Sequence, residues 1–191
     1  MGFKNHELFI ERHRARLRGP FLEIGAKDYG STVNLRTMFP GETYVGIDMA
    51  EGKGVDLTLD LTKPFAEIDA ALNGRRFGTV FCLSVMEHCA QPFLMADNIT
   101  RLLAPGGTLY VSVPYAWKFH GYPSDYWRFT PEGVKKLFPG LAFDMAEART
   151  STDVVGDIQP VDEDLARIRI SASWQRERGR FLRGLGAGVL S

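Results

Sequence analysis

Strand-like and helix-like stretches alternate regularly between residues 20 and 113. Short β-rich stretches lie at 21–24, 43–48, 55–61, 79–84 and 108–113. Between the last two, Met95, Ile99 and Leu102 recur on one helical stripe over residues 92–103. Strands that alternate with helices indicate βαβ units, so the sequence predicts an α/β protein with a mostly parallel sheet.

Further elements are expected at both ends of this region. Helices are predicted over 3–18, over 32–40 (with Ser31 or Thr32 as its cap), over 64–72, and from Thr130-Pro131 onward. Additional strands at 141–148 and 166–173 would complete a Rossmann-like, doubly wound sheet of seven strands with helices on both faces. The predicted organisation is one domain, 1–191, with an N-terminal helix (1–19), a ligand-binding core (20–148), and a C-terminal strand with a basic tail (149–191).

The composition is that of one globular domain and points to no special partner. The chain has 191 residues, with 23 Lys plus Arg and 23 Asp plus Glu, so no net charge favours nucleic acid. Its two cysteines, Cys82 and Cys89, lack the spacing of a disulfide framework or a metal site, and no metal is expected. No stretch matches a signal peptide or a membrane span, which predicts a soluble, cytoplasmic protein whose oligomeric state stays open.

The stretch FLEIGAKDYGS, at 21–31, combines a short strand with a glycine turn. Gly25 and Gly30 have the spacing of a phosphate-binding loop, but Ser31 stands where that loop requires lysine. A dinucleotide site would need a second glycine at residue 27, where Lys27 would crowd a pyrophosphate. The turn therefore favours a ligand without phosphate groups.

Three carboxylates follow neighbouring strands of the predicted sheet. Glu23, Asp48 and Asp60 each stand at or near a predicted strand end, where parallel α/β sheets bind ligands. Acids at these places suit a nucleoside that carries positive charge and no phosphate, and S-adenosylmethionine is such a molecule. Two alternatives stay open: Glu23 pairs with Lys27, and Asp56 replaces Asp60.

The order of these motifs resembles the class I S-adenosylmethionine-dependent methyltransferases over residues 20–140. The matching segments are ExGxxxxGS at 23–31, YVGID at 44–48, VDLTLDL at 55–61, VFCLSVMEH at 80–88 and RLLAPGGTLYVSVP at 101–114. The resemblance implies S-adenosyl-L-methionine as cofactor. The cofactor-binding residues that it implies are Glu23, Gly25, Ala26, Gly30, Ser31, Asp48, Met49, Asp60, Leu61 and Ser84.

The segment HGYPSDYWRFTP, at 120–131, resembles a stretch found in methyltransferases linked to sugar or surface-glycan modification. It predicts a small-molecule or glycan acceptor, with Tyr122, Tyr126, Trp127 and Arg128 as substrate-binding residues. If the acceptor is a hydroxyl, a general base is needed, and the candidates are His120, His88 and Asp125. The alternative is that these aromatic residues and Arg128 only pack the loop.

Two other functions compete with methyl transfer. A non-catalytic scaffold could keep this fold, although the intact glycine turn and Asp48 argue against it. A nicotinamide-dependent oxidoreductase is disfavoured by Lys27. Binding of S-adenosylmethionine would discriminate among the three.

Overall fold

The computed structural model describes residues 3–30, 34–121 and 123–161. These residues fall into two compact units. The first lies within Met1–Phe143 and Asp153–Gly156, and the second within Asp144–Thr152 and Asp157–Ser191. The predicted strand at 166–173 and the predicted site residues Ser31 and Tyr122 lie outside the described residues.

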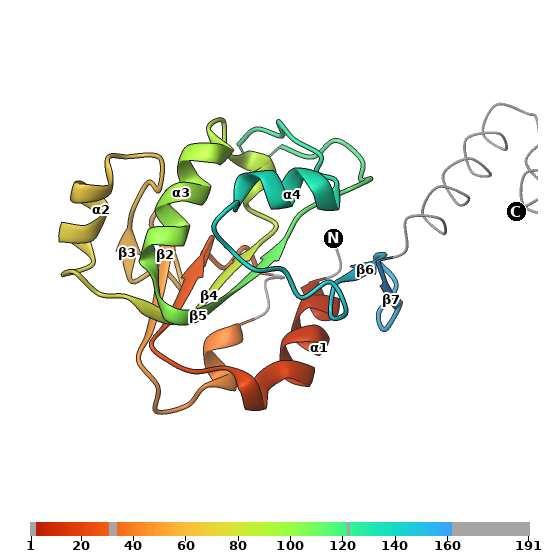
Figure 1. Ribbon diagram of the computed structural model, residues 1–191, viewed down its shortest axis with the longest axis horizontal. Helices are drawn as coiled ribbons and strands as arrows, with labels where there is room; N and C mark the ends of the chain where they lie inside the picture. Colours follow the sequence, from red (N-terminus) through yellow and green to blue (C-terminus); the bar gives the residue numbers. More distant parts are fainter. Residues whose placement is uncertain (1–2, 31–33, 122, 162–191) are drawn as a thin grey trace, which may run out of the picture. The chain divides into compact units, whose positions relative to one another are not determined.

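A five-stranded parallel sheet forms the centre of the first unit (Figure 1). Its strands are β1 (Phe21–Ile24), β2 (Tyr44–Asp48), β3 (Leu57–Thr58), β4 (Phe77–Leu83) and β5 (Leu103–Ser112). They are arranged in the order β3-β2-β1-β4-β5, and every neighbouring pair is parallel. The predicted α/β class with a mostly parallel sheet is confirmed, and the described residues contribute five strands to this sheet.

The chain changes from one side of β1 to the other when it forms β4. From β1 the chain adds β2 and then β3 on one side, and it afterwards places β4 and β5 on the other side. In β1, Ile24 pairs with Ile47 of β2 and with Cys82 of β4. The carboxyl ends of β1 and β4 therefore border the crevice in which open α/β sheets bind ligands.

Among the described residues, helices and short 3-10 turns precede, connect and follow the strands of the sheet. The helices are α1 (Phe3–His13), α2 (Phe65–Ala71), α3 (Pro92–Leu102) and α4 (Pro131–Leu137), and the 3-10 turns are η1 (Arg14–Arg16), η2 (Leu35–Met38) and η3 (Met86–His88). Proline at the start of α3 has a fixed φ that suits a first helical turn. The predicted cap of α4 is confirmed, since the Thr130 hydroxyl accepts a hydrogen bond of 3.0 Å from the Gly133 amide.

Alternate residues of the strands pack in two hydrophobic clusters. Leu22 of β1 belongs to a cluster with Ile68 of α2 and Ile99 of α3, and α3 lies beside α4 (Figure 1). Phe21 belongs to the second cluster, with Ile10 of α1 and the residues around η2. This alternation follows from the period of two in a β-strand, and it fixes the register of β1 between its neighbours.

Several predicted boundaries are wrong. The helix expected over 3–18 ends at His13, and in the described part of 32–40 the chain forms only the 3-10 turn Leu35–Met38. The strand expected at 55–61 is reduced to Leu57–Thr58, because the Asp60 carboxylate accepts hydrogen bonds from the Thr62 amide and hydroxyl and turns the chain.

The second unit contains a small antiparallel pair. No strand forms over 141–148, all of which the structure describes; instead β6 (Arg149–Ser151) pairs with β7 (Ile158–Pro160). Alternating apolar residues at 141–148 resemble a strand in sequence, but Leu141 and Phe143 pack against the larger hydrophobic cluster of the first unit without forming a strand.

Candidate functional site

The chain turns sharply at Gly25, immediately after β1. This glycine has a φ of +76°, and its amide donates a hydrogen bond of 2.9 Å to the Ile47 carbonyl of β2. A Cβ atom at Gly25 would lie 2.4 Å from Cγ2 of Val85, which follows β4. Glycine is therefore required here both by the left-handed backbone and by the close approach of Val85.

Gly30 at the other end of the loop has more room. Its φ is +89°, its amide donates a 2.8 Å hydrogen bond to the Asp28 carboxylate, and no atom of the described residues lies within 4 Å of the place where a Cβ would stand. The two glycines thus share a left-handed conformation, but only Gly25 is packed against another described part of the protein.

A cavity of about 280 Å³ lies beside this turn. Its lining includes Glu23, Ala26, Asp28, Arg36, Lys53 and Asp56. Two ion pairs organise these side chains: Lys53 with Asp28 at 2.8 Å, and Arg36 with Asp56 at 2.5 Å. The structure thus brings together Glu23, Ala26 and Asp56, and Asp56 is the residue considered as an alternative to Asp60.

Glu23 is a largely buried carboxyl group at this cavity. It accepts a 2.7 Å hydrogen bond from the Tyr44 hydroxyl rather than pairing with Lys27, whose ammonium lies 5.4 Å from the centre of the Tyr29 ring. Burial raises the pKa of Glu23 to about 7, against the opposing effects of the Tyr44 hydrogen bond and the Arg36 charge. At neutral pH this carboxyl is poised between its neutral and ionised forms.

Asp48 ends β2 and is held in place by the backbone. One carboxylate oxygen accepts from the Ala50 amide at 3.0 Å and the other from the Lys27 amide at 3.3 Å. These two bonds fix the orientation of the carboxylate, while each oxygen keeps further acceptor capacity for a ligand. Met49, the next residue, is 70% exposed.

Asp60 and Leu61 lie beyond the end of β3. The Asp60 carboxylate is engaged by Thr62, at 2.8 Å from its amide and 2.7 Å from its hydroxyl. Leu61 is buried in the larger hydrophobic cluster, and its carbonyl accepts a 2.8 Å hydrogen bond from the Asn98 side chain. Within the described ranges, neither residue lines the cavity that Glu23 borders.

Ser84 marks the carboxyl end of β4 with an unusual backbone. Its φ of +58° is rare outside glycine, and its amide donates a 2.9 Å hydrogen bond to the Ser112 carbonyl of β5. The bend redirects the chain into η3, which carries Glu87 and His88. Strained backbone of this kind gathers at ligand sites.

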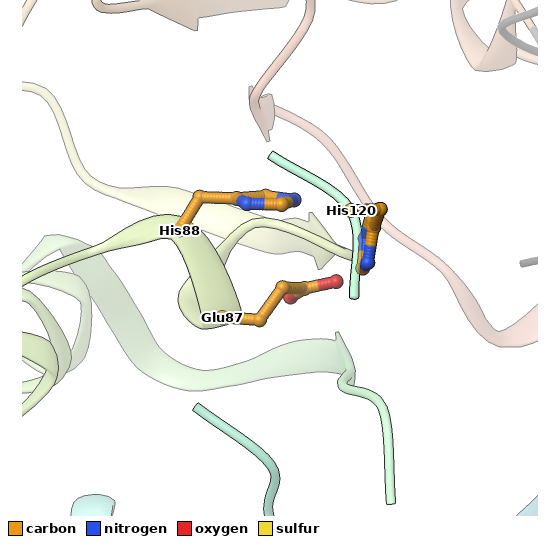
Figure 2. A group of neighbouring side chains, drawn as sticks. All are labelled: Glu87, His88 and His120. Atoms are coloured by element: carbon orange, nitrogen blue, oxygen red, sulfur yellow. The ribbon is translucent and has the colours of Figure 1, made fainter. Parts of the chain in front are cut away.

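Two of the predicted catalytic residues, His88 and His120, lie together, with Glu87 beside them (Figure 2). The rings of His88 and His120 are 5.0 Å apart between centroids and nearly perpendicular. The three residues each offer one polar atom, and these atoms all lie within 4.8 Å of one another. Figure 2 shows the Glu87 carboxylate extending from η3 toward the His120 ring.

Glu87 is fully buried, and neither of its carboxylate oxygens has a hydrogen-bond partner among the residues that the structure describes. Burial raises the pKa of this group above its ordinary range. The sequence interpretation missed Glu87, although a signal was present: an acid closely follows the apolar run of β4 and directly precedes a histidine.

Asp125 anchors the loop that carries His120. Arg128 binds both of its carboxylate oxygens, at 2.5 and 2.7 Å, and the His120 amide donates to it at 2.8 Å. These contacts, chiefly the Arg128 hydrogen bond, hold the pKa of Asp125 below its usual range. Arg128 also donates to the Trp117 and Lys118 carbonyls, so the residue predicted to bind substrate holds the loop together.

The same loop is fastened to η3. The Tyr126 amide donates to the Glu87 carbonyl at 2.8 Å, and the Trp127 indole donates to the Cys89 carbonyl at 2.8 Å. Both aromatic side chains nevertheless remain substantially exposed, at 53% for Tyr126 and 40% for Trp127. They present flat apolar surfaces on the loop that carries His120.

No family model matches the chain, and no curated protein matches it. Among the residues that the structure describes, no helix is both long and apolar enough to cross a membrane.

Proposed function

We propose that this protein is an S-adenosylmethionine-dependent methyltransferase with a Rossmann-like, doubly wound sheet, acting on an oxygen of a small-molecule or glycan acceptor. The proposal rests mainly on one observation. The glycine turn at the reversal of the strand order is flanked by the carboxylates Glu23 and Asp48. The two cations of the neighbouring cavity, Arg36 and Lys53, are paired with Asp56 and Asp28, whereas a phosphate-binding protein would direct such groups at its ligand.

The residues around the turn fit such a ligand. Asp48, oriented by two amides, can accept hydrogen bonds from ribose hydroxyls. A cationic group in the neighbouring cavity would favour the ionised form of Glu23. When bound, S-adenosylmethionine supplies an activated methyl group on a sulfonium. The protein contributes mainly alignment of donor and acceptor, which is worth about 7–11 kcal/mol in well-oriented reactions.

The acceptor side is proposed to be the loop at 114–130. Tyr126 and Trp127 offer apolar faces for a sugar or aromatic ring, and Glu87, His88 and His120 supply polar groups near the carboxyl end of β4. His120 donates through Nδ1 toward the Lys118 carbonyl and Asp125, at 3.2 and 3.3 Å, which leaves its Nε2 lone pair for a proton or a cation.

The experiment is calorimetric titration of the full chain with S-adenosylmethionine and, in parallel, with a nicotinamide dinucleotide. We expect the methyl donor to bind and the dinucleotide not to bind. Asp48→Asn should weaken donor binding, while Asp97→Asn, an exposed acid on α3, should leave the affinity unchanged. A radiolabelled methyl-donor assay against sugars, nucleotide sugars and small phenols then identifies the acceptor.

Each outcome distinguishes among the methyltransferase, the non-catalytic scaffold and the oxidoreductase. Donor binding without transfer to any acceptor would favour a non-catalytic scaffold that keeps the fold. Preferential binding of the dinucleotide would favour an oxidoreductase. Binding of neither compound at millimolar concentration would end the methyltransferase proposal.

A further inference from the structure

Burial of the Glu87 carboxylate is energetically unfavourable, and no hydrogen bond from the described residues offsets this cost. A carboxylate buried without a hydrogen-bond partner is destabilising, and such groups are normally paired, protonated or bound to a metal. The two other side chains in this cluster are imidazoles, which are metal ligands as well as bases. We propose that Glu87, His88 and His120 bind one divalent transition-metal ion of the borderline class represented by Zn²⁺.

The spacing of the three ligand atoms fits one ion. Two ligands on the same tetrahedral Zn²⁺ ion lie about 3.4 Å apart, because each bond is about 2.0–2.2 Å long. The three atoms lie within 4.8 Å of one another, so the widest pair would need to approach by at most about 1.4 Å. The backbone of His120 is held by Asp125, so rotation of the three side chains supplies this approach.

The second nitrogen of each ring is already oriented as metal-binding histidines require. In His88, Nδ1 lies 2.6 Å from the Ser124 carbonyl, which can only accept, so Nδ1 carries the proton. In His120, Nδ1 faces the Lys118 carbonyl and the Asp125 carboxylate, and it is the donor for the same reason. Both rings therefore direct the Nε2 lone pair away from these contacts, as in the outer-shell arrangement of metal sites.

Asp125 is a positioning residue in this scheme. Its carboxylate receives the His120 amide and two guanidinium nitrogens of Arg128, which fixes the His120 segment opposite η3. A carboxylate that holds the far nitrogen of a histidine ligand also raises the basicity of that ligand.

The ligand types select the ion. Imidazole nitrogen suits Zn²⁺, Fe²⁺, Co²⁺ and Ni²⁺, whereas Mg²⁺ and Ca²⁺ prefer sites built from oxygen alone. Three protein ligands leave at least one coordination position open, as in catalytic zinc sites. An acceptor oxygen could take that position; this use of the ion rests on the proposed methyltransferase function, whereas the binding of the ion does not.

The test is calorimetric titration of the chelator-treated full chain with Zn²⁺, without methyl donor. We expect one ion per chain, with much weaker binding of Mg²⁺. Co²⁺ should give the visible absorption of a nitrogen–oxygen site. Glu87→Gln and His120→Asn should each lower the Zn²⁺ affinity by at least about 100-fold, beyond most outer-shell changes. Cys89→Ser should leave the affinity unchanged and thereby exclude a thiolate ligand.

Folding of the variants is checked by thermal unfolding. Glu87→Gln removes a buried, unpartnered carboxylate, so the metal-free variant should melt at the same temperature as the metal-free wild type or higher. Zn²⁺ should raise the melting temperature of the wild type and of Cys89→Ser, but not of Glu87→Gln or His120→Asn.

Several results would overturn the site: no Zn²⁺ binding by the wild type, unchanged affinity in both folded variants, or Mg²⁺ binding as tight as Zn²⁺ binding. Donor binding by wild type and by Glu87→Gln, measured in the same preparations, separates failure of the metal site from failure of the methyltransferase proposal.

Discussion

Glu23 is partly buried and Glu87 is fully buried, and the two carboxyl groups differ in their contacts. Glu23 keeps one hydrogen bond, from the Tyr44 hydroxyl, and borders a cavity that also contains the Arg36 guanidinium. Glu87 has no hydrogen-bond partner for its carboxylate within the described part of the chain. Glu23 is therefore suited to exchange a proton near neutral pH, whereas Glu87 is suited to receive a cation.

The protonation of Glu23 predicts a pH-dependent stability. Folding raises its pKa from the ordinary value of 4.5 to about 7, so the folded state holds this proton more tightly than the unfolded chain. The associated stability is present below pH 4.5 and lost as the pH rises through about 7. Relative to Glu23→Gln, we expect the wild type to lose up to about 3 kcal/mol of unfolding free energy between pH 4.5 and 8.

Urea unfolding at a series of pH values measures this effect. In Glu23→Gln, the amide oxygen of the new side chain can still accept from Tyr44, and both proteins retain Glu87, so the difference between their profiles isolates Glu23. Glu132→Gln, at an exposed position of α4, should parallel the wild type. Parallel profiles of wild type and Glu23→Gln would contradict the raised pKa.

The glycine turn gives a matched pair of substitutions. Gly25 and Gly30 both have a positive φ, for which an alanine costs about 1–2 kcal/mol. Of the two, Gly25 is the position where the new Cβ would meet Val85, which adds about 1–3 kcal/mol of overpacking. We therefore expect Gly25→Ala to lower the unfolding free energy clearly more than Gly30→Ala.

A double-mutant cycle identifies the cause. In a Val85→Ala background, Gly25→Ala should cost less than in the wild type, because the clash is removed. Equal costs of the two alanines, or no coupling to Val85, would show that the approach of Val85 does not govern this turn.

At the scale of single residues, the sequence correctly placed residues whose position depends on the local backbone. Asp48 follows a short β-rich run, and it does end β2. Glu87 was missed because its burial and its lack of a partner among the described residues come from packing, not from neighbours in the chain. The closeness of His88 and His120 was missed for a related reason: a long loop brings together residues that are distant in sequence.

Among the elements, those bounded by strong local signals were predicted best. β1 begins after Pro20, ends before Gly25 and matches its predicted range, while Thr130 and Pro131 correctly mark the start of α4. β3 was predicted too long, since an alternating pattern does not reveal that Asp60 would bind Thr62. Here a side-chain hydrogen bond ends a strand that the hydrophobic pattern would extend.

In the loop at 114–130, Arg128 makes a bidentate contact with Asp125. Lysine at 128 would keep the charge but lose the planar fork that also reaches the Trp117 and Lys118 carbonyls. We expect Arg128→Lys to speed amide hydrogen exchange at 117–121 and 123–128 while exchange in β1 and β4 stays unchanged. Mass spectrometry of peptic fragments measures both regions.

Arg14→Lys is the control for this prediction, because Arg14 makes a long, exposed ion pair with Glu11, at 3.6 Å. It should leave exchange unchanged throughout. Unchanged exchange in Arg128→Lys would mean that the backbone bonds of Tyr126 and the indole bond of Trp127 hold the loop without the guanidinium.

At the scale of the molecule, alternation of strands and helices predicted the parallel sheet but not its extent. The strand order places β1 beside β4, which brings Val85 against Gly25 and η3 close to the glycine turn. Such neighbours are set by long-range pairing, which no short motif specifies. Four of the predicted residues are gathered in two places in the first unit: Glu23 and Ala26 line a cavity, and His88 and His120 belong to a cluster with Glu87.

A ligand that binds only the folded chain must stabilise all of it, and this gives the last prediction. At a concentration one hundred times its dissociation constant, S-adenosylmethionine should add about 2.7 kcal/mol of unfolding free energy. For a chain of this size that corresponds to a rise in melting temperature of about 5–11 °C. Scanning fluorimetry over a concentration series should show the rise growing with the logarithm of concentration. Asp48 stands at the carboxyl end of β2 beside the glycine turn, so Asp48→Asn should shift the rise in melting temperature to higher concentrations of S-adenosylmethionine. Asp97 lies on α3, so Asp97→Asn should not shift it. A rise that is equal in the two variants would remove Asp48 from the site, and an equal rise with a nicotinamide dinucleotide would remove the methyl donor.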